Sequence, residues 1–288
     1  MEYFIHLAIL ISIYAILGVS LNLIVGYTGL LSVTHAAFYG IGAYATAILS
    51  TRYHIGFFTS IIVGVLISAV ISLGIGLVLS KFKEDFYALA SFGFNVIVFS
   101  IFLNWESLTR GPLGIPGIGR PSLFGIDFSS LFVFLILALI FFGIVYLISQ
   151  FIVNSSFGRA LKAIREDEPA AQIFGYRTFG YKLLIFVIGA MMAALAGSLF
   201  ATYVTFVDPS TFTLNESIFI LAIIILGGLA NIRGSVLGAV FLILLPEILR
   251  FVGFPSDIAA QMRQVVYGLL LVIFMLYRPQ GLLGEYKL

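Results

Sequence analysis

Nine apolar stretches of the chain contain no charged residue, and this feature restricts the possible folds more than any other. The stretches cover the following residues: 3–25, 36–51, 57–80, 86–103, 129–149, 183–207, 217–230, 235–246 and 264–277. A charge at the centre of a membrane helix costs about 2.5–3.5 kcal/mol on insertion scales, so lipid selects for such windows. As a helix, the first stretch would cross about 34 Å, which exceeds a hydrocarbon core of about 30 Å. The pattern predicts a polytopic membrane protein.

Composition excludes several other classes. The chain is 61% hydrophobic and 10% charged, whereas soluble domains have about 25% charged residues. A net charge of +2 is too balanced for a nucleic-acid binder, and the absence of cysteine removes disulfides and thiolate metal sites. A membrane β-barrel would alternate polar and apolar residues, but residues 218–226 are continuously apolar. We expect an all-α fold of about nine membrane helices (8–10), forming a single domain over residues 1–288, without a metal site.

Some of the stretches are too short to span a membrane as regular helices. Segments 36–51, 217–230 and 235–246 fall below about 17 residues and are bounded or interrupted by glycine. Such segments either form broken or re-entrant helices along a transport path, or extend into polar residues as tilted helices. The sequence leaves both possibilities open. The start Met1-Glu2-Tyr3 lacks the basic region of a cleavable signal peptide, so we expect the first helix to remain in the fold.

The basic residues predict an orientation in the cell (inner or plasma) membrane. Loop 150–182 carries five Lys and Arg, the largest group in any loop. Placing this loop in the cytoplasm puts ten basic residues inside and five outside, in agreement with the positive-inside rule. The C-terminus is then cytoplasmic, and the N-terminus lies outside if segment 36–51 crosses fully. Loop 104–128, rich in Gly and Pro, would form a cap on the outer face.

Loop 150–182 has the pattern of two short helices. Ser155-Ser156 offers an N-cap for a first helix, which carries an apolar stripe of Phe157, Leu161 and Ile164 and a basic face of Arg159, Lys162 and Arg165. The acidic run 166–168 before Pro169 suits the start of a second helix, which Gly175 would end. The loop either lies on the anionic inner leaflet or docks through its stripe into a soluble partner. The residues alone leave both interpretations open.

Several blocks carry a family resemblance. The segment FGRALKAIREDEPAA (157–171) strongly resembles the cytoplasmic loop of LivM-type permeases, which are membrane subunits of branched-chain amino-acid ABC importers. Residues 168–175 look like a variant of the importers' EAA loop, with one extra residue before the two alanines. Three further blocks are similar to the family in order and at plausible spacing: residues 26–44, 225–229 and 277–284.

The resemblance implies an ABC importer permease fold and a division of labour. A second, LivH-like permease would complete the path for the amino-acid substrate, two ATPase subunits would supply power, and an extracytoplasmic binding protein would deliver substrate. ATP would bind only to the partner subunits, without a cofactor in this chain. By resemblance, the ATPase-coupling residues are Phe157, Gly158, Arg159, Leu161, Arg165, Glu168, Ala170, Ala171 and Gly175. The sequence has no Gly-Lys dipeptide, so it lacks the lysine of a P-loop and indicates a transport subunit rather than an enzyme.

Neutral polar residues within or beside the apolar stretches are candidates for the translocation path: Asn22, Ser32, Thr34, His35 and Asn95. Each also has a structural interpretation, because such side chains form hydrogen bonds to neighbouring membrane helices. Each of these bonds contributes about 0.6 kcal/mol to stability on average. No carboxylate lies within a stretch, so His35 has no partner for a proton relay. Asn215-Glu216 would flank a short outer loop.

Three alternatives remain open from the sequence. A permease of the same superfamily that imports urea or short amides cannot be distinguished by inspection. An ion-coupled secondary transporter often has an intramembrane ionisable relay, which the stretches lack. An intramembrane enzyme would need a nucleophile with a base, paired carboxylates or a metal set, and His35 alone supplies none of these.

Overall fold

The fold is almost entirely helical in this computed structural model. The structure describes residues 2–251 except 83, 124, 125 and 129, together with twelve residues between 265 and 284. Half of the ninth predicted segment, 264–277, and the last four residues therefore lie outside the described residues. The other eight predicted segments are each matched by a helix of the described chain.

Five helices are long and apolar enough to cross a membrane, judged by length and composition. They are α1 (Glu2–Thr28), α3 (Phe57–Leu79), α4 (Glu84–Asn104), α6 (Leu131–Asn154) and α9 (Thr178–Val204). The pair α10 (Leu214–Gly227) and α11 (Ile232–Phe251) bends by 119° and would make six if counted as one span. The predicted number of nine is therefore approximate, because some apolar stretches form short or broken helices.

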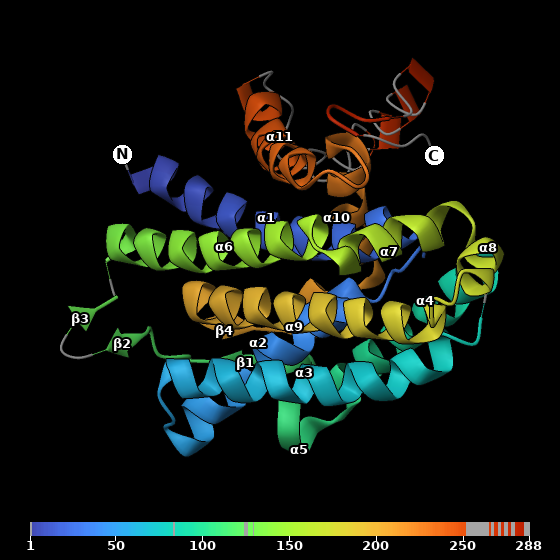
Figure 1. Ribbon diagram of the computed structural model, residues 1–288. Coiled ribbons are helices and arrows are strands. Elements are labelled where there is room, and N and C mark those ends of the chain that lie inside the picture. The colour runs from blue at the N-terminus through green and yellow to red at the C-terminus, as the bar shows by residue number, and fades with distance from the viewer. Residues whose placement is uncertain are drawn as a thin grey trace.

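Helices α1 and α9 form the centre of the molecule (Figure 1). Helix α1 contacts α6, α9, α10 and α11, while α9 packs on α2 (His35–Tyr53) and α3. Every residue of α1 from Ile16 to Thr28 is buried. Small residues allow close approach between α2 and α9, because a Cβ on Gly42 would lie 2.0 Å from the Ala194 carbonyl oxygen. The core thus lies where these central helices meet.

The break between α10 and α11 is built on glycine. Gly228 ends α10 with φ +119°, a conformation that side chains rarely adopt. A Cβ on Gly227 would lie 2.1 Å from the Gly234 carbonyl oxygen, so the two helices touch backbone to backbone at the bend. The short apolar segments 217–230 and 235–246 therefore form a broken pair, one of the two possibilities that the sequence left open.

The predicted cap 104–128 contains short ordered elements. They are α5 (Glu106–Thr109), the 3-10 turn η1 (Gly111–Leu113), β1 (Ile115–Pro116), β2 (Ser122–Leu123) and β3 (Ile126–Asp127). Strand β1 pairs antiparallel with β4 (Phe206–Val207), which follows α9 and precedes the 3-10 turn η2 (Pro209–Phe212). Strand β2 pairs with β3. The cap is thereby attached to the end of α9 that lies away from the loop 150–182.

Candidate coupling segment and membrane path

The segment between α6 and α9 folds as the two predicted short helices, α7 (Ser156–Glu166) and α8 (Glu168–Ile173). The Ser155 hydroxyl accepts a hydrogen bond from the Gly158 amide and caps α7. The Asp167 carboxylate accepts one from the Ala170 amide at 2.9 Å and caps α8, with Pro169 in its first turn. Gly175 adopts φ +88° just beyond α8. Local capping chemistry thus fixes both helices where the sequence predicted them.

The apolar stripe of α7 faces the membrane helices. Leu161 and Ile164 are buried, and the Phe157 ring stacks on Tyr181 of α9 with centroids 5.1 Å apart. Gly158 is also buried, whereas Arg159 is exposed. The stripe therefore attaches α7 to its own protein, and neither to the inner leaflet nor to a soluble partner, the two possibilities that the sequence left open.

Two basic residues fasten α7 to the end of α1. The Arg165 guanidinium donates a hydrogen bond to the Gly26 carbonyl oxygen, and the Lys162 ammonium lies 5.7 Å from the centroid of the Tyr27 ring. Because α1 ends at Thr28, both contacts fall within its last turn. The N-terminal end of α1 lies at the opposite end of the molecule (Figure 1).

Helix α8 is tied to α9 by polar contacts. Glu168 forms a salt bridge with Lys182, which is 7% exposed, and the Gln172 amide donates to the Thr178 hydroxyl at 3.0 Å. Ala171 is buried and Ala170 is half-buried. A cavity of about 380 Å³ lies between this segment and the chain after α1. Its lining includes Arg165, Glu168 and Lys182.

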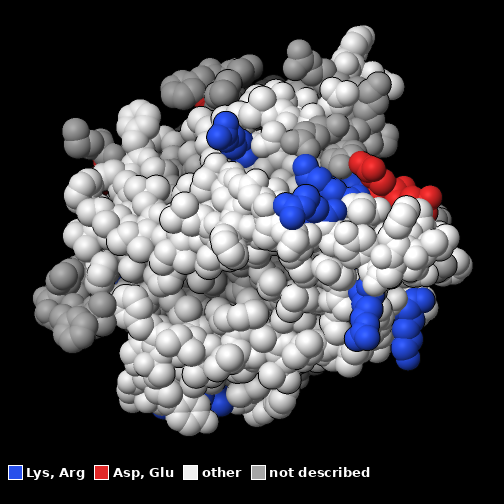
Figure 2. Space-filling view, in the orientation of Figure 1, with Lys and Arg blue, Asp and Glu red and all other residues white. Residues whose placement is uncertain are grey.

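The outer surface of α8 exposes two large apolar side chains. Ile173 is 85% exposed and Phe174 is 82% exposed. Charged side chains gather at the same end of the molecule, whereas most of the visible face carries none (Figure 2). An exposed apolar pair beside charged groups is a candidate protein-contact surface. Both residues lie within the block 168–175 that resembles the EAA loop, but they are not among the predicted coupling residues.

Asn22 of α1 holds the bend between α10 and α11. Its side-chain amide nitrogen lies within hydrogen-bond distance of three acceptors that share its two hydrogens: the Gly228 carbonyl at 3.2 Å, the Asn231 carbonyl at 3.0 Å and the Ser235 hydroxyl at 2.6 Å. Its oxygen accepts from the Ala230 amide at 3.0 Å. Asn22 is fully buried, so these bonds satisfy its entire amide group.

The other four path candidates gather around the start of α2. The Ser32 and Thr34 hydroxyls lie 3.0 Å apart, and His35 Nε2 lies 2.9 Å from the Ser20 hydroxyl of α1. The Asn95 amide of α4 donates to the Val33 carbonyl at 3.1 Å. All four candidates are buried. They form one cluster at the α2 N-terminus, separate from Asn22.

The start of α10 meets this cluster. The Ser217 hydroxyl accepts hydrogen bonds from the Ala36 amide at 3.0 Å and from the Asn95 amide at 2.9 Å. One residue earlier, the Glu216 carboxylate accepts a hydrogen bond of 2.6 Å from the Tyr14 hydroxyl. Tyr14 lies one residue from the midpoint of α1, so a carboxylate does reach the middle of the helix bundle. Although no carboxylate lies within an apolar stretch, α10 begins halfway along α1 and carries Glu216, one residue before its stretch, inward.

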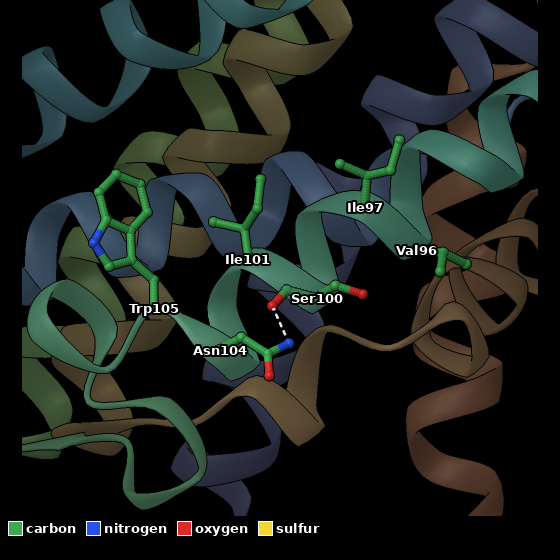
Figure 3. Close-up of a pocket in the computed structure, with 6 residues that line it drawn as sticks. All are labelled: Val96, Ile97, Ser100, Ile101, Asn104 and Trp105. Carbon is green, nitrogen blue, oxygen red and sulfur yellow. Dashed lines mark hydrogen bonds between the residues drawn. The ribbon is translucent and has the colours of Figure 1, made fainter.

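A recess of about 530 Å³ on α4 is a poorer candidate for the path (Figure 3). It is lined by exposed residues from one helix and the residue after it: Val96, Ile97, Ser100, Ile101, Asn104 and Trp105. Its one drawn hydrogen bond joins the Asn104 amide to the Ser100 carbonyl at 2.8 Å. Polar groups from different elements do not converge there. Among the described residues, no group of three or more His, Cys, Asp or Glu is placed to hold a metal ion.

Comparison with known proteins shows what this architecture belongs to. Residues 3–275 match the family described as "Branched-chain amino acid transport system / permease component". The chain is 34% identical to the high-affinity branched-chain amino acid transport system permease protein LivM of Escherichia coli, over 97% of this chain and 69% of that protein. It is 27% identical to the corresponding LivH of Salmonella typhimurium, over 95% of this chain and 92% of that protein.

A third relative, BraD of Pseudomonas aeruginosa, is 26% identical over 95% of this chain and 92% of that protein. No solved structure matches the chain. The family match covers nearly the whole chain and coincides with a bundle of apolar, membrane-crossing helices. The chain therefore belongs to the permease-component family of branched-chain amino acid transport systems.

Proposed function

We propose that this permease is one of two similar membrane subunits of an ATP-driven importer, with residues 1–288 forming a single permease domain. Separate ATPase subunits dock on the segment 150–182 from the cytoplasm, and an extracytoplasmic binding protein delivers a branched-chain or related amino acid. The relatives named above support this assignment, because their printed names describe permeases of such systems. ATP binds to the partner subunits, since this sequence has no P-loop lysine.

One observation carries the proposal: α7 is connected to the α10–α11 bend through hydrogen bonds. Arg165 bonds to the Gly26 carbonyl, Gly26 lies one helical turn after Asn22, and Asn22 holds the bend. Gly26 also approaches Asn22 closely, because a Cβ at this position would lie 1.7 Å from its side-chain oxygen. Movement of α7 is thus passed to a broken helix pair, the kind of element that lines transport paths.

The docking surface itself is α8. Ile173 and Phe174 are exposed and apolar, and the salt bridge between Glu168 and Lys182 joins their helix to α9. An ATPase subunit that holds these two side chains pulls on α9 through α8 and on α1 through α7. The nine coupling residues therefore act in two ways: the buried ones transmit movement, and the exposed ones, with Ile173 and Phe174, face the partner.

The experiment is uptake into vesicles that contain the complete transporter purified through a tag on this chain. When ATP is supplied to the ATPase subunits, the vesicles should accumulate leucine, isoleucine or valine, even after ionophores have collapsed the proton and sodium gradients. Uptake that stops with the gradients at constant ATP would contradict the proposal and indicate an ion-coupled transporter. Accumulation of urea or acetamide, with no amino-acid uptake, would contradict an amino acid as the substrate. The proposal of ATP-driven import would still stand.

A further inference from the structure

The first turns of α2 and α10 meet inside the bundle. The Ala36 amide of α2 donates to the Ser217 hydroxyl of α10 at 3.0 Å. Neither Thr34 nor Thr213, which precede these helices, caps the helix that follows with its side chain. Both helices therefore present the positive ends of their dipoles beside one another, away from either end of α1.

Glu216 places a carboxylate at this meeting point. It lies in the first turn of α10, where the helix dipole favours negative charge, and the Tyr14 hydroxyl donates to it at 2.6 Å. No salt bridge between Glu216 and a basic residue occurs within the described part of the chain. The side chain keeps part of its surface exposed. A carboxylate in such surroundings favours a cationic group as its partner.

Buried polar atoms without hydrogen-bond partners lie around the same point. Among the described residues these include His35 Nδ1, Asn95 Oδ1 and the Tyr39 hydroxyl. His35 precedes Ala36, Tyr39 lies about one turn later on α2, and the Asn95 amide donates to Ser217. An unsatisfied buried polar atom costs about 1–3 kcal/mol, so such atoms mark places where a polar ligand is favourable.

We propose that the ammonium group of the amino-acid substrate binds to the Glu216 carboxylate, with the substrate's own carboxylate facing the first turns of α2 and α10. The arrangement favours a zwitterion over an inorganic cation, because two positive helix ends repel a bare cation but attract a carboxylate. Tyr14 holds Glu216 in position. The inference rests on the proposed function, since it names the site at which the imported amino acid is recognised.

The test compares three variants of the complete transporter in vesicles. Glu216→Gln keeps the shape of the side chain and an oxygen that accepts from Tyr14 but removes the charge. We expect leucine uptake to fall at least tenfold, while ATP hydrolysis stimulated by the loaded binding protein persists. Glu216→Asp should recover part of the uptake. Asn215→Ala, in the same turn but exposed, should match the wild type.

Each outcome decides the question. Wild-type uptake by Glu216→Gln would overturn the ammonium site, because an amide would then serve as well as a carboxylate. Equal thermal stability of Glu216→Gln and wild type, together with lost uptake, supports recognition rather than folding. A lowered melting temperature that accounts for the loss would assign Glu216 a structural role instead. A wild-type transporter that accumulates no amino acid would refute the proposed function, and the site with it.

Discussion

Asn22 shows how one buried amide can set the shape of a broken helix pair. Its nitrogen and oxygen satisfy backbone groups on both sides of the bend, from Gly228 to Asn231. From the sequence, Asn22 is predicted both as a path residue and as a helix-bonding residue. The structure places it entirely in hydrogen bonds to the bend, because α1 passes beside the point where α10 ends.

Asn22→Ala should lower the free energy of unfolding by about 2–4 kcal/mol, since it leaves the buried Gly228 carbonyl and Ala230 amide without this partner. Thermal denaturation of the purified protein measures the effect. Asn104→Ala is the matched control, because that amide is exposed and bonds only within α4. Equal melting temperatures for the two variants would show that the bend does not depend on Asn22.

Glu216 illustrates a residue whose importance the sequence conceals. It stands directly before the apolar stretch 217–230, so its position along the chain suggested an outer loop. Depth depends instead on where the neighbouring helices begin, and α10 starts halfway along α1, beside Tyr14. The depth of Glu216 could have been inferred from the short length of α10. A helix of 14 residues must start or end within the membrane.

At the scale of helices, packing between α2 and α9 depends on small residues. Gly42 approaches the Ala194 carbonyl, and Gly197 approaches the Tyr39 carbonyl, where a Cβ would lie 1.9 Å away. The spacing of the alanines and Gly197 along one face of α9 indicates close approach by a neighbouring helix. It did not identify α2 as the partner, because spacing within one helix carries no information about the opposite surface.

Gly42→Ala should destabilise the protein by about 1–3 kcal/mol, because the added methyl group meets backbone that cannot move aside. Gly74→Ala on α3 is the control, since a Cβ there meets nothing within 4 Å. Chemical or thermal unfolding of both variants in the same detergent checks the difference. If Gly42→Ala is as stable as Gly74→Ala, the two helices do not pack as closely as described.

Helix α7 buries its apolar stripe against the membrane helices, whereas α8 exposes its apolar pair to a partner. Replacing Ile173 and Phe174 by serine should weaken attachment of the ATPase subunits, because the exposed apolar pair would be lost. Co-purification of the subunits through a tag on this chain measures attachment. Leu113→Ser, at a residue of η1 that is 82% exposed, is the control. Unchanged attachment in the double variant would exclude α8 as the docking surface.

Much of the architecture at the scale of the whole molecule could be predicted from the sequence. Charge-free stretches located the described long helices, and capping residues located α7 and α8. The depth at which α2 and α10 begin could not be predicted, because both starts are set by bonds between distant segments, such as Ala36 with Ser217. Burial of the α7 stripe was missed for the same reason, since an apolar stripe indicates burial without naming what covers it.

The proposed orientation places α8 in the cytoplasm and the α2–α3 junction outside. The chain has no cysteine, so single cysteines can be introduced without a background. We expect a membrane-impermeant maleimide to label His54→Cys in intact cells and Ile173→Cys only after the cells are opened; both positions are exposed. Labelling of Ile173→Cys in intact cells would invert the orientation and exclude docking of cytoplasmic ATPase subunits on α8.

The central claim is that movement of α7 reaches the α10–α11 bend through Arg165 and Asn22. Its most direct test is the number of leucine molecules imported per ATP hydrolysed by the complete transporter in vesicles. Arg165→Gln removes the guanidinium contact with Gly26 and should lower this ratio at least tenfold while hydrolysis continues. Arg177→Gln, at an exposed residue after α8, should keep the wild-type ratio. An Arg165→Gln transporter with an unchanged ratio would contradict the account.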